Sequence, residues 1–354
     1  MTPATGPARA LGAVWLAALG LGVAATCGSP RPPASVAPTA EPVGGLSISR
    51  ALLPVVIGWP ATMAPRTPTP TRAPRPTASP RDALIARVVG FARLRGVDGA
   101  GLRGVPCEVR SLEWRGADTL AACLERPGRW ITFAVRGRLT MRGDLSVPSN
   151  TTIDAREAGV QLWGGGLVLS RAENVIIAGL AITECDDDAI KVTEHSAGVY
   201  LDGLDLSRCH DGLVDITDNA TDVTLAHSTL RDHAKAMLIG ASDGHASDSV
   251  IRVTIHDTIF ATTYRHPMCR YGYVHLDRAT FGPWVGDAVD ARFGCRVLIT
   301  RSWFVPGAHG LRAAARFVVP SAPGAVRIDA ATDLGRASAE VGGEVADPPY
   351  GRLP

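Results

Sequence analysis

The sequence carries little net charge, few aromatic residues and no apolar run long enough for a convincing membrane span. With 36 Lys and Arg against 34 Asp and Glu, the net charge is only +2, which argues against nucleic acid as a partner. Aromatic residues make up 5% of the 354 residues, whereas Gly (38) and Pro (26) are frequent. Short alternating runs of Gly, Val, Thr, Asp and Ser favour many strands joined by tight turns.

Residues 1–27 have the pattern of an export signal. Arg9 is followed by the apolar run LGAVWLAALGLGVAA, which is too short to cross a bilayer. Cys27 comes directly after it, at the position of the acylated cysteine in a bacterial lipoprotein, although Thr26 before it is atypical. Two alternatives stay open: a membrane tether through Cys27, or plain secretion that leaves a spare cysteine. Both predict a secreted or extracellular protein.

Three segments follow this signal. Residues 28–82 are rich in Pro, Thr, Ala and Ser and end in TPTPTRAPRPTASP, so they cannot bury enough apolar surface to fold alone. We therefore expect a disordered linker at 28–82 and a folded domain at 83–320. Residues 321–354 are expected to be an extension that packs on the domain or trails from it. We expect a monomer.

Cysteine usage predicts disulfides in this domain. An even number in an exported chain favours disulfide bonds, and six cysteines allow 15 pairings. Sequence does not choose among them, although neighbours along the chain are the preferred partners. The six are Cys107, Cys123, Cys185, Cys209, Cys269 and Cys295.

A strand-like segment recurs through the domain at a nearly constant interval. One reference position can be aligned in each segment, and these positions are Thr151, Val175, Val199, Val223, Val253, Val274 and Val297. The period is roughly 20–30 residues, which lies in the range of solenoid repeats. Because apolar residues alternate inside each repeat, the pattern predicts an all-β fold: a right-handed parallel β-helix with one turn per repeat.

A β-sandwich is the alternative fold. Sandwich strands recur about every 8–12 residues, so each repeat could hold two or three of them. The constancy of the reference position favours the β-helix. The segment GADTLAACLE is the best helix candidate, and we expect it to cap the N-terminal end of the solenoid.

The repeat places four charged residues in a line. Asp188, Asp211, Lys235 and Arg265 each follow the reference valine of their repeat at nearly the same offset. Adjacent coils are about 4.7–4.9 Å apart, so these residues form a stripe about 14–15 Å tall. Two acids occupy one end of it and two bases the other.

The acidic half of the stripe predicts a calcium site. Asp188, Asp211 and Asp215, with Asp186 nearby, offer the oxygen ligands that Ca²⁺ takes in irregular geometry. Soft metals are disfavoured because no His or Cys cluster shares this phase. The alternative is that these aspartates only form turns on a soluble face.

The basic half consists of Lys235, Arg265 and Arg270, and it suits a substrate with repeated carboxylates. A polyuronate could bridge to Ca²⁺ and to these cations. Neutralising its carboxylate acidifies the neighbouring C–H bond, which makes β-elimination of the glycosidic bond available. The alternative for the arginines is surface pairing with carboxylates.

Several motifs, in order, resemble the pectate lyase superfamily, polysaccharide lyase family 1. They cover about Ile85 to Phe304. The motifs are SNTTIDA, DDAI, DGLVD, DHAKAMLIG and RHPMCRYGYVH, with GFARLRG as a degraded form of an N-terminal glycine-rich segment. The resemblance implies a β-helix enzyme that cleaves polygalacturonate, an acidic polysaccharide, by Ca²⁺-dependent β-elimination in pectin degradation.

The resemblance also implies roles for single residues. Asp188, Asp211 and Asp215 would bind Ca²⁺, with Asp186 as a further ligand. Lys235 and Arg270 would bind the substrate carboxylate or stabilise the enolate-like transition state. Arg265 would be the general base, a role that needs a crowded cationic site because a guanidinium normally stays protonated.

The chain also departs from the family pattern. The family's WIDH is YLDG here, which keeps Asp202, and its HHN and NN positions are His256–Asp257 and Asp277–Arg278. His266 beside Arg265 is also unusual. These changes weaken the usual asparagine ladder and put substrate preference in question.

Two other functions remain as alternatives. The first is a non-catalytic polysaccharide-binding protein derived from a lyase. The second is a β-helix glycoside hydrolase, which needs paired carboxyls at a set separation and would leave the Lys–Arg half unexplained.

Overall fold

The computed structural model describes residues 79–262, 264–306, 311–318 and 324–354. The predicted signal peptide, Cys27 and the linker up to residue 78 lie outside the described residues. In the part of the chain that is described, no helix has the length and apolar character needed to cross a membrane.

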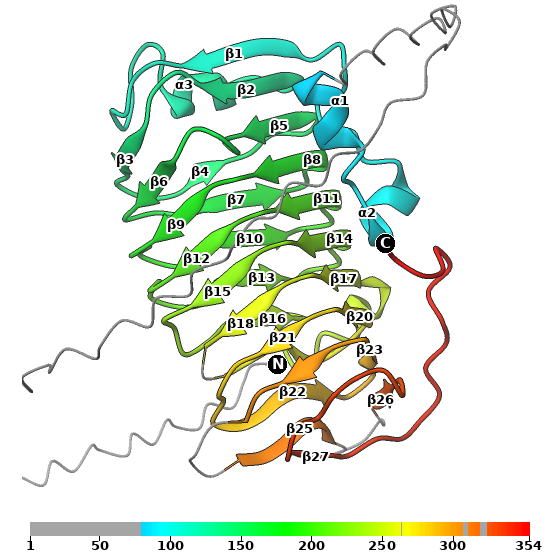
Figure 1. The fold of residues 1–354 in the computed structure, drawn as a ribbon. Helices are drawn as coiled ribbons and strands as arrows, with labels where there is room; N and C mark the ends of the chain where they lie inside the picture. Colours follow the sequence, from blue (N-terminus) through cyan, green and yellow to red (C-terminus); the bar gives the residue numbers. More distant parts are fainter. Residues whose placement is uncertain (1–78, 263, 307–310, 319–323) are drawn as a thin grey trace, which may run out of the picture. The chain divides into compact units, whose positions relative to one another are not determined.

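The strands form three parallel sheets that wind into a right-handed parallel β-helix, as the repeat predicts (Figure 1). Sheet A contains, in order, β1 (Val105–Val109), β2 (Arg129–Phe133), β5 (Thr151–Asp154), β8 (Glu173–Ala178), β11 (Ala197–Asp202), β14 (Thr221–Ala226), β17 (Arg252–His256), β20 (Tyr273–Asp277), β23 (Arg296–Thr300) and β26 (Ala325–Ile328). Sheet B contains β3 (Gly137–Thr140), β6 (Val160–Trp163), β9 (Ala181–Thr183), β12 (Asp205–Ser207), β15 (Thr229–Arg231), β18 (Ile259–Ala261), β21 (Thr280–Phe281) and β24 (Trp303–Phe304). Sheet C contains β4 (Leu145–Ser146), β7 (Leu167–Ser170), β10 (Ile190–Thr193), β13 (Val214–Ile216), β16 (Met237–Ile239), β19 (Met268–Cys269), β22 (Gly286–Arg292), β25 (Leu311–Val318) and β27 (Ser338–Ala339).

The predicted interior column is confirmed. Thr151 pairs with Val175, and each later reference valine pairs with the next one through to Val297. All seven positions are fully buried. Because every second residue of a strand faces inward, one column of valines fixes the register of all these coils. The β-sandwich alternative is therefore wrong.

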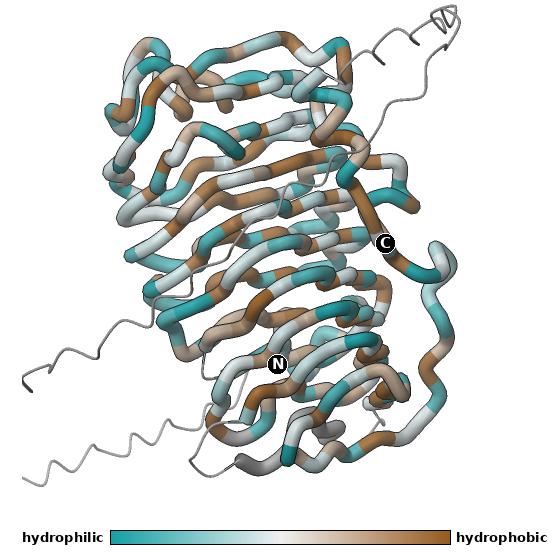
Figure 2. The backbone as a smooth tube through the Cα atoms, in the orientation of Figure 1, coloured by the Kyte–Doolittle hydropathy of each residue, from teal (hydrophilic) through white to brown (hydrophobic). Residues whose placement is uncertain are grey.

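Aromatic side chains form a second interior stack along sheet B. Phe260, Phe281 and Phe304 lie on consecutive coils, with ring centroids 5.3 and 4.2 Å apart and nearly parallel planes. Apolar and polar residues are interspersed along each coil (Figure 2). Some of the few aromatic residues therefore fill the interior of the coils that contain β18, β21 and β24.

Helix α3 (Leu120–Leu124) lies where the GADTLAACLE segment predicts a helix, with Thr119 accepting a hydrogen bond from the backbone of Ala122 at its start. Its buried residues join the interior cluster beside β1 and β2 at the N-terminal end of the solenoid (Figure 1). The predicted N-terminal cap is confirmed.

Two short helices that the sequence pattern did not indicate cover the outer face of sheet A. They are α1 (Pro80–Ile85), which begins inside the predicted linker, and α2 (Gly90–Arg95). Backbone N–H groups of α2 donate to outward-facing threonines, Ala92 to Thr224 and Phe91 to Thr254. Their short length and weak periodicity explain why they were missed.

Part of the C-terminal extension packs on the same face. Figure 1 shows this segment, in red, returning along the solenoid to end beside α2. The Tyr350 ring lies 5.0 Å from that of Phe91, and its hydroxyl hydrogen-bonds to Thr254 and His275.

The disulfides join neighbours along the chain, as preferred from the sequence. The pairs are Cys107–Cys123, Cys185–Cys209 and Cys269–Cys295. The second bond links two consecutive turns that lead into sheet C.

Candidate active site

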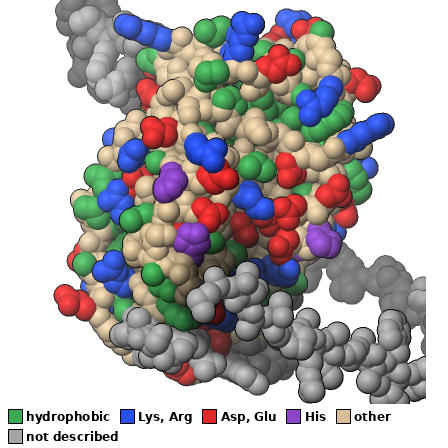
Figure 3. All heavy atoms as spheres, turned by 180° about the vertical axis from the view of Figure 1, so that it is seen from behind, with side chains coloured by type: hydrophobic (Ala, Val, Ile, Leu, Met, Phe, Trp, Pro, Cys, Tyr) green, Lys and Arg blue, Asp and Glu red, His purple; other side chains and the backbone are tan. Residues whose placement is uncertain are grey.

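Three of the four predicted acidic residues, Asp188, Asp211 and Asp215, lie close together at the turns that enter sheet C. Asp188 shortly precedes β10, Asp211 lies just before β13, and Asp215 is inside β13. Carboxylate oxygens of Asp187, Asp188 and Asp211 lie within 4.8 Å of one another. In the view from behind, acidic side chains gather near the middle of the face, with basic ones beside them (Figure 3).

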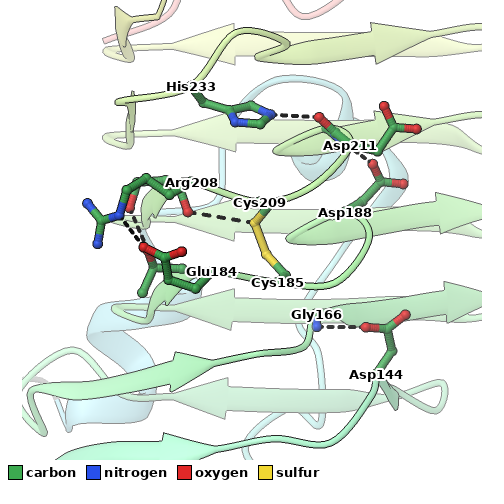
Figure 4. The surroundings of a disulfide bond; sticks show 12 residues. Asp144, Gly166, Glu184, Cys185, Asp188, Arg208, Cys209, Asp211 and His233 are labelled. Carbon is green, nitrogen blue, oxygen red and sulfur yellow. Dashed lines mark hydrogen bonds and ion pairs between the residues drawn. A yellow bond between two sulfur atoms is a disulfide. The ribbon is translucent and has the colours of Figure 1, made fainter. Parts of the chain in front are cut away.

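The Cys185–Cys209 disulfide joins these two turns beside the carboxylates (Figure 4). Each cysteine lies two or three residues before a carboxylate of the cluster, Asp188 or Asp211. His233 also reaches back to this loop, where its Nε2 lies 2.6 Å from the carbonyl oxygen of Asp211. The carboxylates are therefore held by a cross-linked scaffold rather than by free loops.

Two lysines neutralise part of this negative charge. Lys191 Nζ lies 2.7 Å from Asp187 and 3.0 Å from Asp188, and Lys235 Nζ lies 2.5 Å from Asp211. The hydrogen bond from Lys235 holds the pKa of Asp211 below its usual range. These are the only two lysines among 36 Lys and Arg. An ammonium is a compact point charge, unlike the planar guanidinium fork.

Asp215 is the least compensated acid of the cluster. Its Oδ1 atom is buried and has no hydrogen-bond partner among the described residues. Burial, followed by the charges of Asp188 and Asp211, raises the pKa of Asp215 to about 7. An isolated buried carboxylate is costly, which favours a cation beside it.

The backbone leaves room for such a cation. A Cβ atom on Gly212 would lie 2.5 Å from Asp215 Oδ1 and 2.8 Å from Asp188 Oδ1, so only glycine fits there. The N–H of Gly212 donates to Asp188 at 2.6 Å. An all-oxygen donor set with an unpartnered buried oxygen fits Ca²⁺, which Asp188, Asp211 and Asp215 would hold.

The predicted base lies at the edge of this cluster. Arg265 has φ of +59°, and its carbonyl accepts a hydrogen bond from Met237 at 2.9 Å. Its Nε is buried and lacks a hydrogen-bond partner within the described residues. The charge of Arg265 also contributes, after that of Lys235, to the lowered pKa of Asp211. The structure therefore brings Arg265 close to the carboxylates and Lys235.

Two predicted site residues lie outside the cluster. Asp186 is exposed and is not among the grouped carboxylates. Arg270 follows β19, where its Nε donates to Asp243 at 2.8 Å and its Nη1 to the carbonyl of Gly240 at 3.0 Å. The Arg270 side chain therefore already has protein partners on the next turn, and Asp243 orients it.

Sequence reasoning missed Asp187, Lys191 and Asp243. A signal for Asp187 was present, because Asp187, Asp211 and Lys235 are equally spaced along the chain. Their spacing equals the interval between Val175 and Val199 on consecutive coils. Asp188 lies one residue later than this regular series. No periodic signal marked Lys191 or Asp243, since one projects from a strand and the other from an irregular loop.

The solenoid and its motifs place this protein in the class of parallel β-helix proteins of the pectate lyase type. The family profile described as pectate lyase matches residues 138–318, and the chain belongs to this family. Pectate lyase 4 of Ambrosia artemisiifolia is 32% identical over 213 residues, 54% of this chain and 53% of that protein. The chain spans about half the length of the curated relatives it matches.

Solved structures agree in fold. The crystal structure of the major allergen from cedar pollen matches with a TM-score of 0.64 at 23% identity, over 73% of this chain and 85% of that one. A pectate lyase from Bacillus sp. N165 in complex with trigalacturonate matches with a TM-score of 0.61 at 21% identity, over 75% and 93%. At these identities the likeness concerns the fold.

Proposed function

We propose that the chain is an exported polysaccharide lyase that cleaves polygalacturonate by Ca²⁺-dependent β-elimination. One observation carries the proposal: the Arg265 guanidinium, with an unpartnered buried Nε, lies beside a carboxylate cluster and Lys235. The family membership and the oligogalacturonate complex of a fold relative support the substrate class.

Three basic residues of the chain have separate roles in the proposed reaction. Lys235 binds a uronate carboxylate, and this withdraws charge from the adjacent carbon and acidifies its proton. Arg265 first gives one guanidinium proton to solvent and then, in its neutral form, takes the proton from that carbon. The electron pair left behind forms a double bond to the neighbouring carbon, the glycosidic C–O bond there breaks, and the departing oxygen takes a proton from solvent. Arg270, oriented by Asp243, binds a carboxylate of the next sugar.

The proposed Ca²⁺ ion would neutralise the substrate carboxylate further. Its protein ligands would be Asp188, Asp211 and Asp215. For Asp211 to serve, Lys235 has to exchange its 2.5 Å contact with Asp211 for the substrate carboxylate. Substrate and metal binding are therefore coupled in the proposal.

Export is a separate part of the proposal. It is supported by the predicted signal in residues 1–27 and by three disulfides within the domain, which persist in oxidising compartments. The tether through Cys27 stays a prediction, and intact-mass analysis of the protein from its native host tests it.

The deciding experiment follows ultraviolet absorbance during incubation with polygalacturonate. β-Elimination creates an unsaturated, absorbing product, whereas hydrolysis does not. We expect absorbance to rise with Ca²⁺ present and to stop when EDTA is added. Reducing ends formed without absorbance would instead indicate a hydrolase.

A non-catalytic polysaccharide-binding protein is the second candidate. It is favoured by the ion pairs that occupy Asp187, Asp188, Asp211 and Arg270. Binding to immobilised polygalacturonate without product in the same assay would select it.

A further inference from the structure

A second group of residues with metal-ligating chemistry lies at the corner between sheets A and B, away from the acidic cluster. His227 directly follows β14, His256 is the last residue of β17, and Asp257 follows it. The backbone N–H of His227 donates to the carbonyl of His256 at 3.0 Å, so consecutive coils align the three residues. His256 and Asp257 are positions where the sequence departs from the family's asparagine ladder.

The side chains converge on one carboxylate oxygen. Asp257 Oδ2 lies 3.2 Å from His256 Nε2 and 3.8 Å from His227 Nε2. One ligand atom from each residue lies within 4.8 Å of the other two. The two imidazole rings are 84° apart in orientation, with centroids at 5.7 Å, so they approach a common point from two sides.

The opposite nitrogen of each imidazole is held by a separate carboxylate. His227 Nδ1 lies 2.6 Å from Asp202, and His256 Nδ1 lies 2.9 Å from Asp277. Such partners fix the Nδ1–H tautomer and leave the Nε2 lone pair for a ligand. Both Nε2 atoms face Asp257 Oδ2, the carboxylate oxygen of the same group.

The surrounding charges orient this group without blocking it. Arg278 donates two hydrogen bonds of 2.7 Å to Asp257 and fixes the plane of its carboxylate, whose remaining lone pairs stay available. Arg87 and Arg301 pair in the same way with Asp202 and Asp277. Because each carboxylate has an arginine, a bound divalent ion would add net positive charge, which a bound hydroxide or another anion would reduce.

The three side chains differ in their exposure to solvent. The side chain of His256 is 3% exposed, that of Asp257 22% and that of His227 34%. An ion among the three would therefore meet solvent beside His227. Three protein ligands with one open position describe the arrangement of zinc sites that retain a water.

We propose that His227, His256 and Asp257 bind one transition-metal ion of the zinc type. Two nitrogen ligands and one carboxylate select Zn²⁺, Cu²⁺ or Ni²⁺ over Ca²⁺ and Mg²⁺, which prefer oxygen. The ion links β14 to β17 and stabilises the folded chain by binding it in preference to the unfolded one. The site is independent of the proposed lyase chemistry.

The test uses tag-free full-length protein stripped of metal by dialysis against a chelator. Zn²⁺ is titrated calorimetrically, and Co²⁺ is followed by visible absorption as a probe of coordination. We expect one equivalent to bind, with absorption bands typical of low-coordinate Co²⁺, and the melting temperature to rise with Zn²⁺.

The variant His227→Asn removes one ligand. Asparagine tolerates the φ of +50° at this corner, so the backbone should be kept. We expect the affinity for Zn²⁺ to fall by more than about 100-fold, since loss of an orienting partner alone costs about 10- to 100-fold. Asp277→Asn, which removes such a partner, should give the smaller effect.

The matched control is His195→Asn. His195 is also exposed and has φ of +62°, but it lies outside the group. We expect it to bind Zn²⁺ like the unaltered protein. Absence of stoichiometric binding by the unaltered protein, or equal isotherms for His227→Asn and His195→Asn, would overturn the proposal.

Discussion

The ammonium of Lys191 lies 2.7 Å from Asp187 and forms a second contact, of 3.0 Å, within the same carboxylate cluster. Although burial acts to lower it, these hydrogen bonds raise the pKa of Lys191 above its ordinary value, so the side chain stays charged. The proposed Ca²⁺ ion would therefore enter a cluster that already contains a cation.

Lys191→Met should increase the affinity for Ca²⁺. A like charge about 4 Å away costs about 4 kcal/mol at an effective dielectric constant near 20, and solvent screening reduces this for a partly exposed lysine. We expect an increase of at least about tenfold, equivalent to about 1.4 kcal/mol, in calorimetric titration without substrate.

The control for this prediction is Arg208→Met. Arg208 is a nearby exposed cation that pairs with Glu184 at 2.5 Å rather than with the cluster (Figure 4). It should leave Ca²⁺ affinity nearly unchanged. Equal affinities for Lys191→Met and the unaltered protein would show that Lys191 does not compete with the metal.

Gly212→Ala should disrupt the metal site while the fold remains. The added Cβ would approach two carboxylate oxygens, the nearer being Asp215 Oδ1 at 2.5 Å. We expect Ca²⁺ binding to fall at least about tenfold in the same titration, with an unaltered circular dichroism spectrum. Gly244→Ala, whose Cβ meets nothing within 4 Å, is the control. Unchanged affinity in Gly212→Ala would exclude Ca²⁺ from this position.

Arg265→Lys should stop turnover without preventing binding. Lysine keeps the charge but lacks the planar guanidinium, so the proton acceptor would be misplaced. Loss of a general base costs about 10²- to 10⁴-fold in rate. The measurements are the initial rate of absorbance increase and retention on immobilised polygalacturonate. Arg270→Lys should retain more activity, because Arg270 binds a substrate carboxylate and does not take the proton. If Arg265→Lys keeps most of the rate, Arg265 is not the base.

His266 should make the fold sensitive to acid. It is fully buried beside the Phe260 ring, and burial lowers the pKa of His266 to about 3. An unfolded histidine titrates near about 6.5, so the unfolded chain binds the extra proton between these values. Stability from this residue is complete above about 6.5 and is lost as the pH falls towards 3.

Urea denaturation at several pH values checks this. The variant His266→Gln should lose less stability on acidification than the unaltered protein, while substitution of the exposed His195 should not change the pH dependence. Parallel curves for His266→Gln and the unaltered protein would contradict the prediction.

The repeat in the sequence by itself determined the β-helix. A valine that recurs once in every coil predicts a buried column, because strands that stack in register must present the same face inward at each coil. The same periodicity brought Asp188, Asp211, Lys235 and Arg265 to one side of the molecule. The pairing of cysteines that are neighbours along the chain also agrees with a fold in which each coil contacts mainly the coils before and after it.

Only the tertiary structure decided the contacts that depend on side-chain reach. It grouped Asp187 instead of Asp186 with the other carboxylates, placed Lys191 among them, and turned Arg270 towards Asp243. It also brought His227 beside Asp257, which belongs to the next coil. Periodicity gives the coil and the face of a residue, but turns with positive φ and irregular loops set the direction of its side chain, and those directions are fixed by packing between coils.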